Sequence, residues 1–402
     1  MKKLLSSLPK SIWVISITGF LINMATIMVF SQMPIFMKTE LGASEHTIGA
    51  IDGFVEFVSH AMRIVAGSIS DIIQNRKVVL GVGYGLSALV KPLFALSSSV
   101  GFVVFIRSLD RITNGLQASP RDALIGDLVP KTKRGSSYGL SKSLKTAGSV
   151  TGAAIVVWIM TISGNNFRLL FLCAFIPAII ALVLFIFGIK EPKAVPLKEI
   201  TKPKQKPFNW RSVFELKKDY WHVIGMLGIY ELAHFGESYL TFRVREVGVN
   251  ITYISMVMVL FNMGQFLSAF PIGALSDRFR RENILLLGFS FMLLANMCMI
   301  FGASPLFVYL GVFFWGAQMG TTQSVFVSMV SEKAPKHVRG TAFGIFYIVM
   351  GIDILIASKF AGVLWDRFGS IGAFRYSAVV TCISILVLLF WKHKQTQKII
   401  SA

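Results

Sequence analysis

The 402-residue chain is poor in charge and in cysteine. Only 15% of its residues are charged and 54% are hydrophobic, whereas soluble domains are usually about 25% charged. A composition this apolar argues against a soluble protein and indicates a chain that lies in a bilayer. Three cysteines, Cys173, Cys298 and Cys382, are too few for a disulfide framework, so we interpret them as small apolar residues of membrane spans.

Sequence motifs of enzymes are also missing. The chain has no Walker A loop, no HExxH or cysteine-rich metal site, and no Gly-x-Ser-x-Gly elbow. His60 with Glu56 resembles a base and its orienting partner, but no serine or cysteine nucleophile is evident beside them. We therefore expect no enzyme, no cofactor and no bound metal.

Acidic residues are scarce as well, since 20 Asp and Glu face 40 Lys and Arg. The cations do not form a nucleic-acid-binding patch, because most lie outside the apolar runs, in the connections between them, including short tracts at 76–77, 131–134, 278–281 and 392–394. Cytoplasmic loops of membrane proteins have this pattern under the positive-inside rule. We expect a multi-pass protein of the cytoplasmic (inner) membrane with both termini in the cytoplasm, surrounded by lipid and not bound to nucleic acid.

Long apolar runs dominate the rest of the chain. A helix needs about 20 mostly apolar residues to cross the hydrocarbon core. The first run is too long for a signal peptide and no cleavage site follows it, so we expect a retained span. Twelve runs fit, at roughly 11–37, 46–70, 77–97, 101–128, 137–162, 168–189, 220–243, 251–274, 283–302, 305–330, 341–364 and 375–391.

The two halves of the chain repeat each other. GSISDIIQNR at Gly67 matches GALSDRFRR at Gly273, PKTKRGSSYG matches PKHVRGTAFG, and Phe167-Arg168 matches Phe374-Arg375, each pair about 206 residues apart. Between the halves lies a linker rich in proline and lysine. We expect an N-terminal six-helix bundle at 1–189, a basic cytoplasmic linker at 190–219 and a C-terminal six-helix bundle at 220–402.

These motifs resemble those of the major facilitator superfamily. GSISD and GALSDR are similar to its loop signature, and RITNGLQA places Arg111 and Gly115 as in its Arg-x-x-x-Gly motif. ASPRDALIGDLVPKTKRG resembles a prokaryotic subgroup with an Ala-Pro-Arg-Asp-Ala-Leu-Ile run. The resemblance implies an all-α integral membrane fold of two pseudo-symmetric six-helix bundles. It also implies a monomeric secondary active transporter that works by alternating access.

The resemblance further implies a conformational latch on the inner side, in which carboxylates hold helix N-termini of the opposite half. An alternative is that these charges only set topology. The first loop copy departs from the family pattern at Ile72 and Gln74, and the second at Arg280. The latch residues would be Gly67, Asp71, Arg76, Arg134, Gly273, Asp277, Arg278 and Arg339.

Four ionisable residues interrupt the second apolar run, IDGFVEFVSHAMRIVAG. Asp52, Glu56, His60 and Arg63 fall on one face of a helix, and such residues should face a cavity or a partner. Asp52 and Glu56 lie one turn apart, and double ionisation of such a pair out of water is unfavourable. An imidazole such as His60 exchanges protons near neutral pH. We therefore predict proton coupling at Asp52, Glu56 and His60, with Glu231 or Asp353 as the second choice.

Cations and aromatic residues in other spans predict where the substrate binds. Arginine grips a carboxylate or phosphate through two parallel hydrogen bonds, and aromatic rings stack on an organic body. We expect a small polar organic solute with an anionic group, carried by proton symport. The predicted substrate-binding residues are Arg107, Arg111, Lys145, Tyr230, His234, Trp315, Gln318, Tyr347 and Lys359.

Other functions stay open. A proton-driven efflux antiporter for drugs or metabolites is an alternative, although GSVTG at Gly148–Gly152 lacks the proline that follows in the family's antiporter motif. A permease for siderophores or metal chelates and a lipid flippase are further options. A receptor that does not transport and a membrane enzyme are the least favoured.

The ionisable residues also have purely structural interpretations. His234 would then be a satisfied core histidine, and Lys142 would extend to the inner surface. The remaining charges would form ion pairs, Arg63 with Asp71, Arg121 with Asp122, and Arg111 with Asp110 or Asp52.

Overall fold

The structure is a computed structural model that describes residues 8–73, 75–129, 134–189, 215–275, 280–335 and 338–400. These residues form helices and short connections, without a β-strand among them. The chain divides into two compact units. The first holds the described residues within Met1–Leu41, Val58–Pro207 and Ile251–Met258, and the second those within Gly42–Phe57, Phe208–Asn250 and Val259–Ala402.

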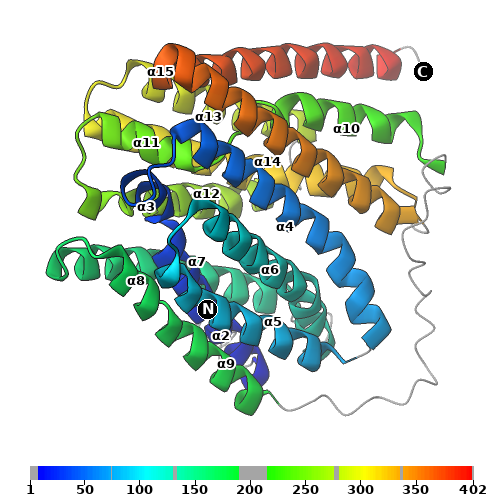
Figure 1. Cartoon of the computed structure of the whole chain (residues 1–402). Coiled ribbons are helices and arrows are strands. Elements are labelled where there is room, and N and C mark those ends of the chain that lie inside the picture. The colour runs from blue at the N-terminus through cyan, green and yellow to red at the C-terminus, as the bar shows by residue number, and fades with distance from the viewer. Residues whose placement is uncertain are drawn as a thin grey trace, which may run out of the picture. The chain divides into compact units, whose positions relative to one another are not determined.

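Figure 1 labels the helices in chain order. The first part of the chain forms α2 (Lys10–Phe30), α3 (Met33–Thr39), α4 (Glu45–Ile73), α5 (Arg76–Leu93), η1 (Phe94–Leu96), α6 (Val100–Leu128), α7 (Arg134–Ile162), α8 (Phe167–Cys173) and α9 (Phe175–Gly188). The second forms α10 (Lys218–Glu231), α11 (Ser238–Glu246), η4 (Ile251–Tyr253), α12 (Met256–Leu275), α13 (Arg281–Phe301), α14 (Pro305–Lys333) and α15 (Arg339–Ile400).

The two units exchange the beginnings of two helices. Residues 42–57, with the first half of α4, belong to the second unit, whereas residues 251–258, which lead into α12, belong to the first. The two segments occupy matching places in the sequence repeat. The bundle boundaries at 1–189 and 220–402 remain a prediction. They do not anticipate that residues 42–57 belong to the second unit and residues 251–258 to the first.

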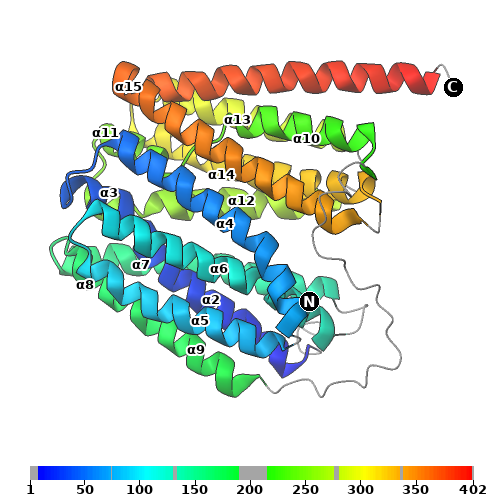
Figure 2. The same cartoon turned by 45° about the vertical axis from the view of Figure 1, so that its right-hand side comes forward.

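The first unit is built around α2. This helix packs against α7 and α9, and α5 packs against α6 and α9, as Figures 1 and 2 show. Its core joins apolar side chains of four helices, including Ile15, Leu80, Ile125 and Phe185. The arrangement brings the polar faces of α2, α6 and α7 close to one another.

Glycines set the distance between α2 and α7. A Cβ at Gly148 would overlap the Phe20 carbonyl oxygen, and one at Gly152 would lie 2.8 Å from the Met24 carbonyl oxygen. Small residues of this kind let two membrane helices approach closely. The GSVTG segment therefore serves helix packing in this chain.

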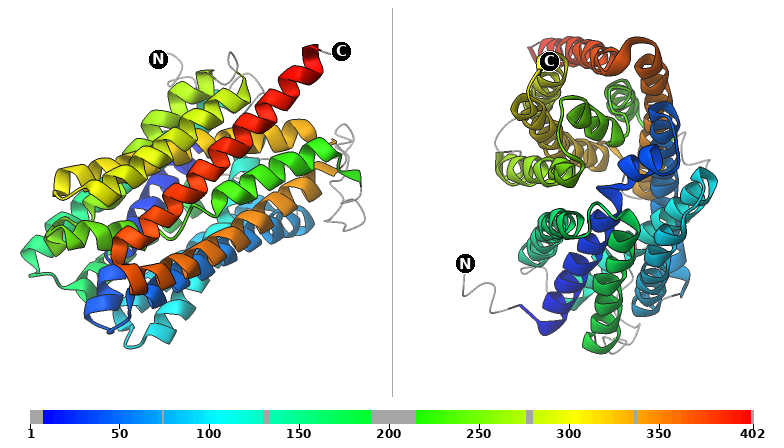
Figure 3. Two further views of the ribbon diagram at one scale, coloured as in Figure 1. Left: turned by 90° about the horizontal axis from the view of Figure 1, so that it is seen from above. Right: turned by 60° about the vertical axis from the view of Figure 1, so that its left-hand side comes forward.

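The second unit packs α13 against α14 and α15, and α10 against α15. Its interior is aromatic, with Tyr230 stacked on Phe289 at 3.9 Å between ring centroids and Phe235 tilted against Trp315 at 5.1 Å. Helix α15 bends at Gly369, whose φ of 69° and ψ of −173° are accessible almost only to glycine. The bend divides α15 into the two legs seen in Figure 3, which correspond to the last two predicted spans.

The predicted span 220–243 is wrong in one respect, because it is two helices and not one. Helix α10 ends at Glu231, α11 begins at Ser238, and residues 232–237 between them are not helical. The break contains Gly236 and the ionisable His234 and Glu237. His234 and Glu237 therefore do not lie on one continuous helix with Glu231.

Among the described residues, seven stretches are long and apolar enough to cross a membrane: Lys10–Thr39, Arg76–Leu96, Leu140–Ile162, Phe167–Gly188, Ile251–Ser268, Arg281–Phe301 and Thr341–His393. The last contains two predicted spans, so four of the twelve predicted spans fall outside this set, at 46–70, 101–128, 220–243 and 305–330. These four carry most of the predicted substrate and proton residues. Span 220–243 falls outside because α10 and α11 have only 14 and 9 residues. In the other three, polar side chains lower the hydropathy, as expected of a span that lines a polar interior.

We predict that Gly148→Ala destabilises the protein by about 1–3 kcal/mol, because the added methyl group meets the backbone of α2. A Cβ at Gly81 on α5 would meet no atom of the described residues within 4 Å. The control Gly81→Ala should be neutral or stabilising by about 0.5–1 kcal/mol. Thermal unfolding of the purified variants measures both, and equal midpoints would contradict the close α2–α7 contact.

Candidate functional site

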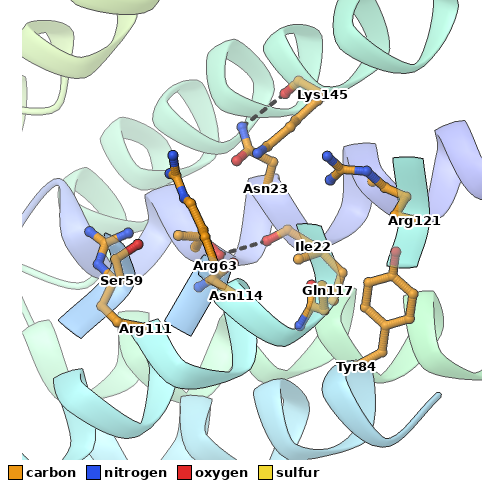
Figure 4. A pocket seen from close by; sticks show the side chains of 12 residues that line it. Ile22, Asn23, Ser59, Arg63, Tyr84, Arg111, Asn114, Gln117, Arg121 and Lys145 are labelled. Carbon is orange, nitrogen blue, oxygen red and sulfur yellow. Dashed lines mark hydrogen bonds between the residues drawn. The ribbon is translucent and has the colours of Figure 1, made fainter. Parts of the chain in front are cut away.

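A cavity of 140 Å³ lies inside the first unit. Of the twelve described residues that line it, four are cations and none is acidic. Figure 4 shows the cations around Asn23; they come from α4, α6 and α7. We call this the basic cavity; its lining residues are Gly19, Ile22, Asn23, Thr26, Ser59, Arg63, Tyr84, Arg111, Asn114, Gln117, Arg121 and Lys145.

Helix α6 supplies one whole side of the basic cavity. Arg111, Asn114, Gln117 and Arg121 are three or four residues apart, so they share one face of the helix. The helix starts at Ser99, whose hydroxyl accepts a hydrogen bond from the Phe102 amide at 3.3 Å. The Gln117 amide donates to the Gly83 carbonyl oxygen at 2.9 Å, which ties α6 to α5.

A buried ion pair stands beside the basic cavity. Lys91 Nζ lies 2.8 Å from Asp110 Oδ1, and both side chains are 0% exposed. Lys91 also donates to Thr26 Oγ1 at 3.3 Å, and Asn114 donates to Asp110 Oδ2 at 3.1 Å. The carboxylate of Asp110, which precedes the lining residue Arg111, is therefore held by a lysine and an amide.

Three cations of this region lie close to the ring of Phe30. Its centroid lies 4.5 Å from Arg111 Cζ, 5.2 Å from Arg107 Cζ and 5.5 Å from Lys91 Nζ. A cation within about 6 Å of an aromatic face is attracted by the ring quadrupole. Phe30 therefore helps to fix the guanidinium groups that α6 presents.

The second unit gathers a different set of polar residues around α10. The Tyr230 hydroxyl donates to Gln318 Oε1 at 2.6 Å, and His234 Nδ1 lies 3.5 Å from Glu231 Oε2. The His234 ring makes T-shaped contacts with Tyr230, at 4.7 Å between ring centroids, and with Trp315, at 6.2 Å. Glu231 is 8% exposed.

Asp353 on α15 faces the same part of α10. A Cβ at Gly228, one turn before Glu231, would lie 3.4 Å from Asp353 Oδ2. We call Tyr230, Glu231, His234, Trp315, Gln318 and Asp353 the acidic cluster. It joins α10, α14 and α15 with the segment after α10.

The predicted stripe on α4 is divided between the units. Asp52 and Glu56 belong to the second unit, and His60 and Arg63 to the first. Asp52 is buried and its Oδ2 accepts a hydrogen bond from the Ser238 amide at 3.2 Å. His60 is buried, Glu56 is half-buried and Arg63 lines the basic cavity.

Comparison with known proteins identifies the family to which the chain belongs. The sequence profile described as Major Facilitator Superfamily matches residues 15–243 and 219–401. The chain belongs to the major facilitator superfamily. It is therefore a multi-pass membrane transporter and not an enzyme, and it has the family's all-α fold with pseudo-symmetric halves.

Individual relatives agree with this assignment. An uncharacterized MFS-type transporter of Methanocaldococcus jannaschii is 27% identical over 391 residues, which is 95% of each chain. The multi-drug resistance efflux pump PmrA of Streptococcus pneumoniae is 24% identical over 387 residues, 92% of this chain and 91% of the pump. The crystal structure of the nucleoside transporter NupG has a TM-score of 0.74 at 12% identity, over 95% of this chain and 98% of that one.

The remaining predicted residues of this superfamily member lie as follows. Lys145 lines the basic cavity, and Arg107 lies beside it at the ring of Phe30. Tyr347 is half-buried with its ring 5.2 Å from Phe346, and Lys359 is exposed. Of the predicted substrate residues, Arg107, Arg111 and Lys145 belong to the first unit and the others to the second, in which Tyr347 and Lys359 are not part of the acidic cluster.

The predicted latch lies mostly at positions whose side chains the structure does not describe, and Asp277 and Arg278 lie outside the described residues altogether. Arg76 is the first residue of α5. The preceding residue, Asn75, caps the helix, because its side chain accepts a hydrogen bond from the Val78 amide at 3.1 Å. Asp122, the alternative partner of Arg121, is also among the side chains that the structure does not describe. So are those of Gly67, Asp71, Arg134, Gly273, Asp277, Arg278 and Arg339.

Sequence reasoning missed Lys91 and Phe30. Lys91 had a signal, since it lies inside the apolar run 77–97, whose other lysine, Lys77, is the first residue of the run. Asp110 was expected to pair with Arg111 if it was structural, and the structure gives it Lys91. Phe30 had no signal, because one aromatic residue among 34 phenylalanines does not stand out.

We predict that Lys91→Met destabilises the transporter by about 3–5 kcal/mol, because it leaves the Asp110 carboxylate buried without its cation. The double variant Lys91→Met/Asp110→Leu should recover most of this loss, because no buried charge is left unpaired. Thermal unfolding of the three proteins measures both effects. A double variant less stable than Lys91→Met would contradict the pairing.

Proposed function

We propose that the chain is a proton-coupled secondary transporter that moves a small polar organic solute with an anionic group by alternating access. The observation that carries this proposal is the basic cavity, lined by Arg63, Arg111, Arg121 and Lys145. The asymmetry of basic loops supports a protein of the cytoplasmic membrane with both termini inside, and membership of the superfamily supports a monomer.

Arg111 is the residue that we assign to the anionic group. Its guanidinium can form two parallel hydrogen bonds to a carboxylate or phosphate, and the ring of Phe30 fixes its position. Amide side chains of Asn23, Asn114 and Gln117 line the same cavity. Their NH2 groups already donate within the unit, whereas their carbonyl oxygens can accept from hydroxyl groups on the rest of a solute.

We predict that Arg111→Ala weakens binding of the anionic ligand at least about tenfold. Ligands would be found by thermal stabilisation of the purified protein, with organic acids, amino acids, nucleosides and siderophores as probes at two pH values. Arg111→Lys keeps the positive charge but cannot form two parallel hydrogen bonds. Its affinity for the ligand should therefore lie between those of the wild type and of Arg111→Ala.

Arg367→Ala is the matched control, because Arg367 is an exposed cation of the second unit and should leave affinity unchanged. Stabilisation of Arg111→Ala equal to that of the wild type would contradict the assignment. A screen in which only organic cations stabilise the protein would reject an anionic substrate.

The acidic cluster is our proposed site of proton coupling. Glu231 is buried with an imidazole as its neighbour, and Asp353 faces the same helix. A carboxyl group away from water favours the neutral form until a partner or water reaches it. Binding and release of a proton at Glu231 can thereby follow the conformation of the transporter. Asp52 accepts a hydrogen bond from the Ser238 amide, so we do not assign proton transfer to it. Glu56 and His60 remain alternative proton carriers.

We predict that Glu231→Gln removes the dependence of transport on the pH gradient while substrate binding is retained. The measurement is uptake of the ligand from the screen into proteoliposomes, with and without an imposed gradient. The control is Glu332→Gln, since Glu332 is an exposed carboxylate paired with Arg281. Gradient-driven uptake that persists in Glu231→Gln would move the coupling site to Glu56 and His60.

Proton-driven efflux is the second candidate. The relative named as a multi-drug resistance efflux pump favours it, and the aromatic rings beside Glu231 would suit an organic cation. The missing proline after Gly152 favours symport instead. Reversing the gradient in the same proteoliposomes, with a cationic dye as a second probe, separates the two directions. If the substrate is a siderophore, an anionic chelate should stabilise the protein in the thermal screen.

A further inference from the structure

The first half of α4 is joined to α11 and to the first leg of α15 within the second unit. We call this the α4 junction and define it by Gly49, Asp52 and Gly53 of α4, residues 236–239, and Ser358 and Gly362 of α15. In the predicted orientation it lies towards the outer side of the membrane. Helix α4 continues from the junction into the first unit at Val58.

Asp52 supplies α11 with the acceptor that its own sequence does not. The residue before α11, Glu237, makes no capping hydrogen bond with its side chain. Asp52 Oδ2 instead accepts from the amide of Ser238, the first residue of α11, at 3.2 Å. A helix N-terminus has unpaired N–H groups and a partial positive charge, so a carboxylate there is favourable.

Glycines bring the three segments of the junction into close contact. A Cβ at Gly236 would lie 2.6 Å from Asp52 Cβ, and one at Gly53 would lie 2.9 Å from Ser358 Cβ. A Cβ at Gly49 would overlap the Tyr239 side chain. There is no room for a methyl group at these places while the junction is closed.

Hydroxyl groups complete the junction. Ser358 Oγ accepts from the Gly236 amide at 3.0 Å, and the Tyr239 hydroxyl donates to the Ser358 carbonyl oxygen at 3.2 Å. His46 Nδ1 and Asp366 Oδ2 lie 3.5 Å apart at its partly exposed end. Contacts among glycines and hydroxyl groups bury little apolar surface, so separating them costs less than opening a hydrophobic core.

The repeat supplies a comparison for Asp52. The matching segment, residues 251–258, is joined to the first unit by neutral groups, with Gln32 Nε2 donating to the Ile251 carbonyl oxygen at 3.1 Å and Ser255 Oγ to Ser31 Oγ at 3.1 Å. Met258 stands where the first repeat has Asp52. The exchange of helix beginnings therefore does not require a carboxylate, and Asp52 does something in addition.

We propose that Asp52 is a positioning residue of the transport cycle, whose side-chain oxygen holds the N-terminus of α11 on α4 and releases it each time the α4 junction opens. The inference rests on the alternating-access cycle proposed above and is independent of the substrate. It replaces the predicted role of Asp52 as a proton carrier with that of a hydrogen-bond acceptor.

Thiol labelling of a buried reporter tests this directly. Cys173, Cys298 and Cys382 are replaced by serine, and Ser358, which is 0% exposed, is changed to cysteine. A maleimide reaches Cys at this position only when the junction opens. Asp52→Ala in this background should be labelled roughly tenfold faster or more, because the acceptor is lost. Asp52→Asn keeps a side-chain oxygen and should stay closer to the parent than to Asp52→Ala.

Asp219→Asn is the matched control, because Asp219 is an exposed carboxylate on α10 that pairs with Lys333. Its labelling rate should equal that of the parent. Equal rates in Asp52→Ala and the parent would overturn the proposal, and so would an Asp52→Asn variant labelled as fast as Asp52→Ala.

If Asp52→Ala does not fold, Gly49→Ala provides a second variant that leaves Asp52 in place. Its methyl group should push Tyr239 away from α4 and accelerate labelling, and an unchanged rate would overturn the junction. Labelling needs no ligand, so its outcome is separate from that of the anion screen. Fast labelling of Asp52→Ala without any anion response would reject the substrate class and keep the role of Asp52.

Discussion

An ionised side chain inside a membrane is tolerated only where another polar group or a water-filled cavity receives it. Lys91 and Asp110 show the constraint most directly, because both are fully buried and lie 2.8 Å apart. Hydrogen bonds from Lys91 to Thr26 and from Asn114 to Asp110 complete the pair. The pair therefore ties α5 to α6 beside the basic cavity and holds α6 with its polar face towards that cavity.

The same constraint explains why the two units differ in charge although the chain repeats itself. The first unit holds the cations of the basic cavity, and the second holds Glu231 and Asp353 among aromatic rings. A fold made of two similar halves leaves the polar positions of each half free to differ. Substrate recognition in one unit and proton exchange in the other would use this freedom, with the α4 junction as one place where the cycle has to break contacts.

Local properties of the sequence were sufficient for the fold. Apolar run lengths, the repeat of about 206 residues and the loop motifs predict an all-α membrane protein of this superfamily, and the family match confirms it. The spacing of Arg111, Asn114, Gln117 and Arg121 likewise follows from one helix, because residues three and four apart share a face. Predictions of this kind succeed because they depend only on neighbours along the chain.

Contacts between distant residues decided the rest. Asp52 and Ser238 are 186 residues apart, so no local pattern distinguishes a helix-capping carboxylate from a proton carrier. The partner of Asp110, the break between α10 and α11, and the exchange of residues 42–57 and 251–258 were equally hidden. Sequence by itself determined which residues are too polar for lipid, because hydropathy is a property of each side chain. Only the tertiary structure decided which partner each of them has, because that depends on how helices remote in sequence pack together.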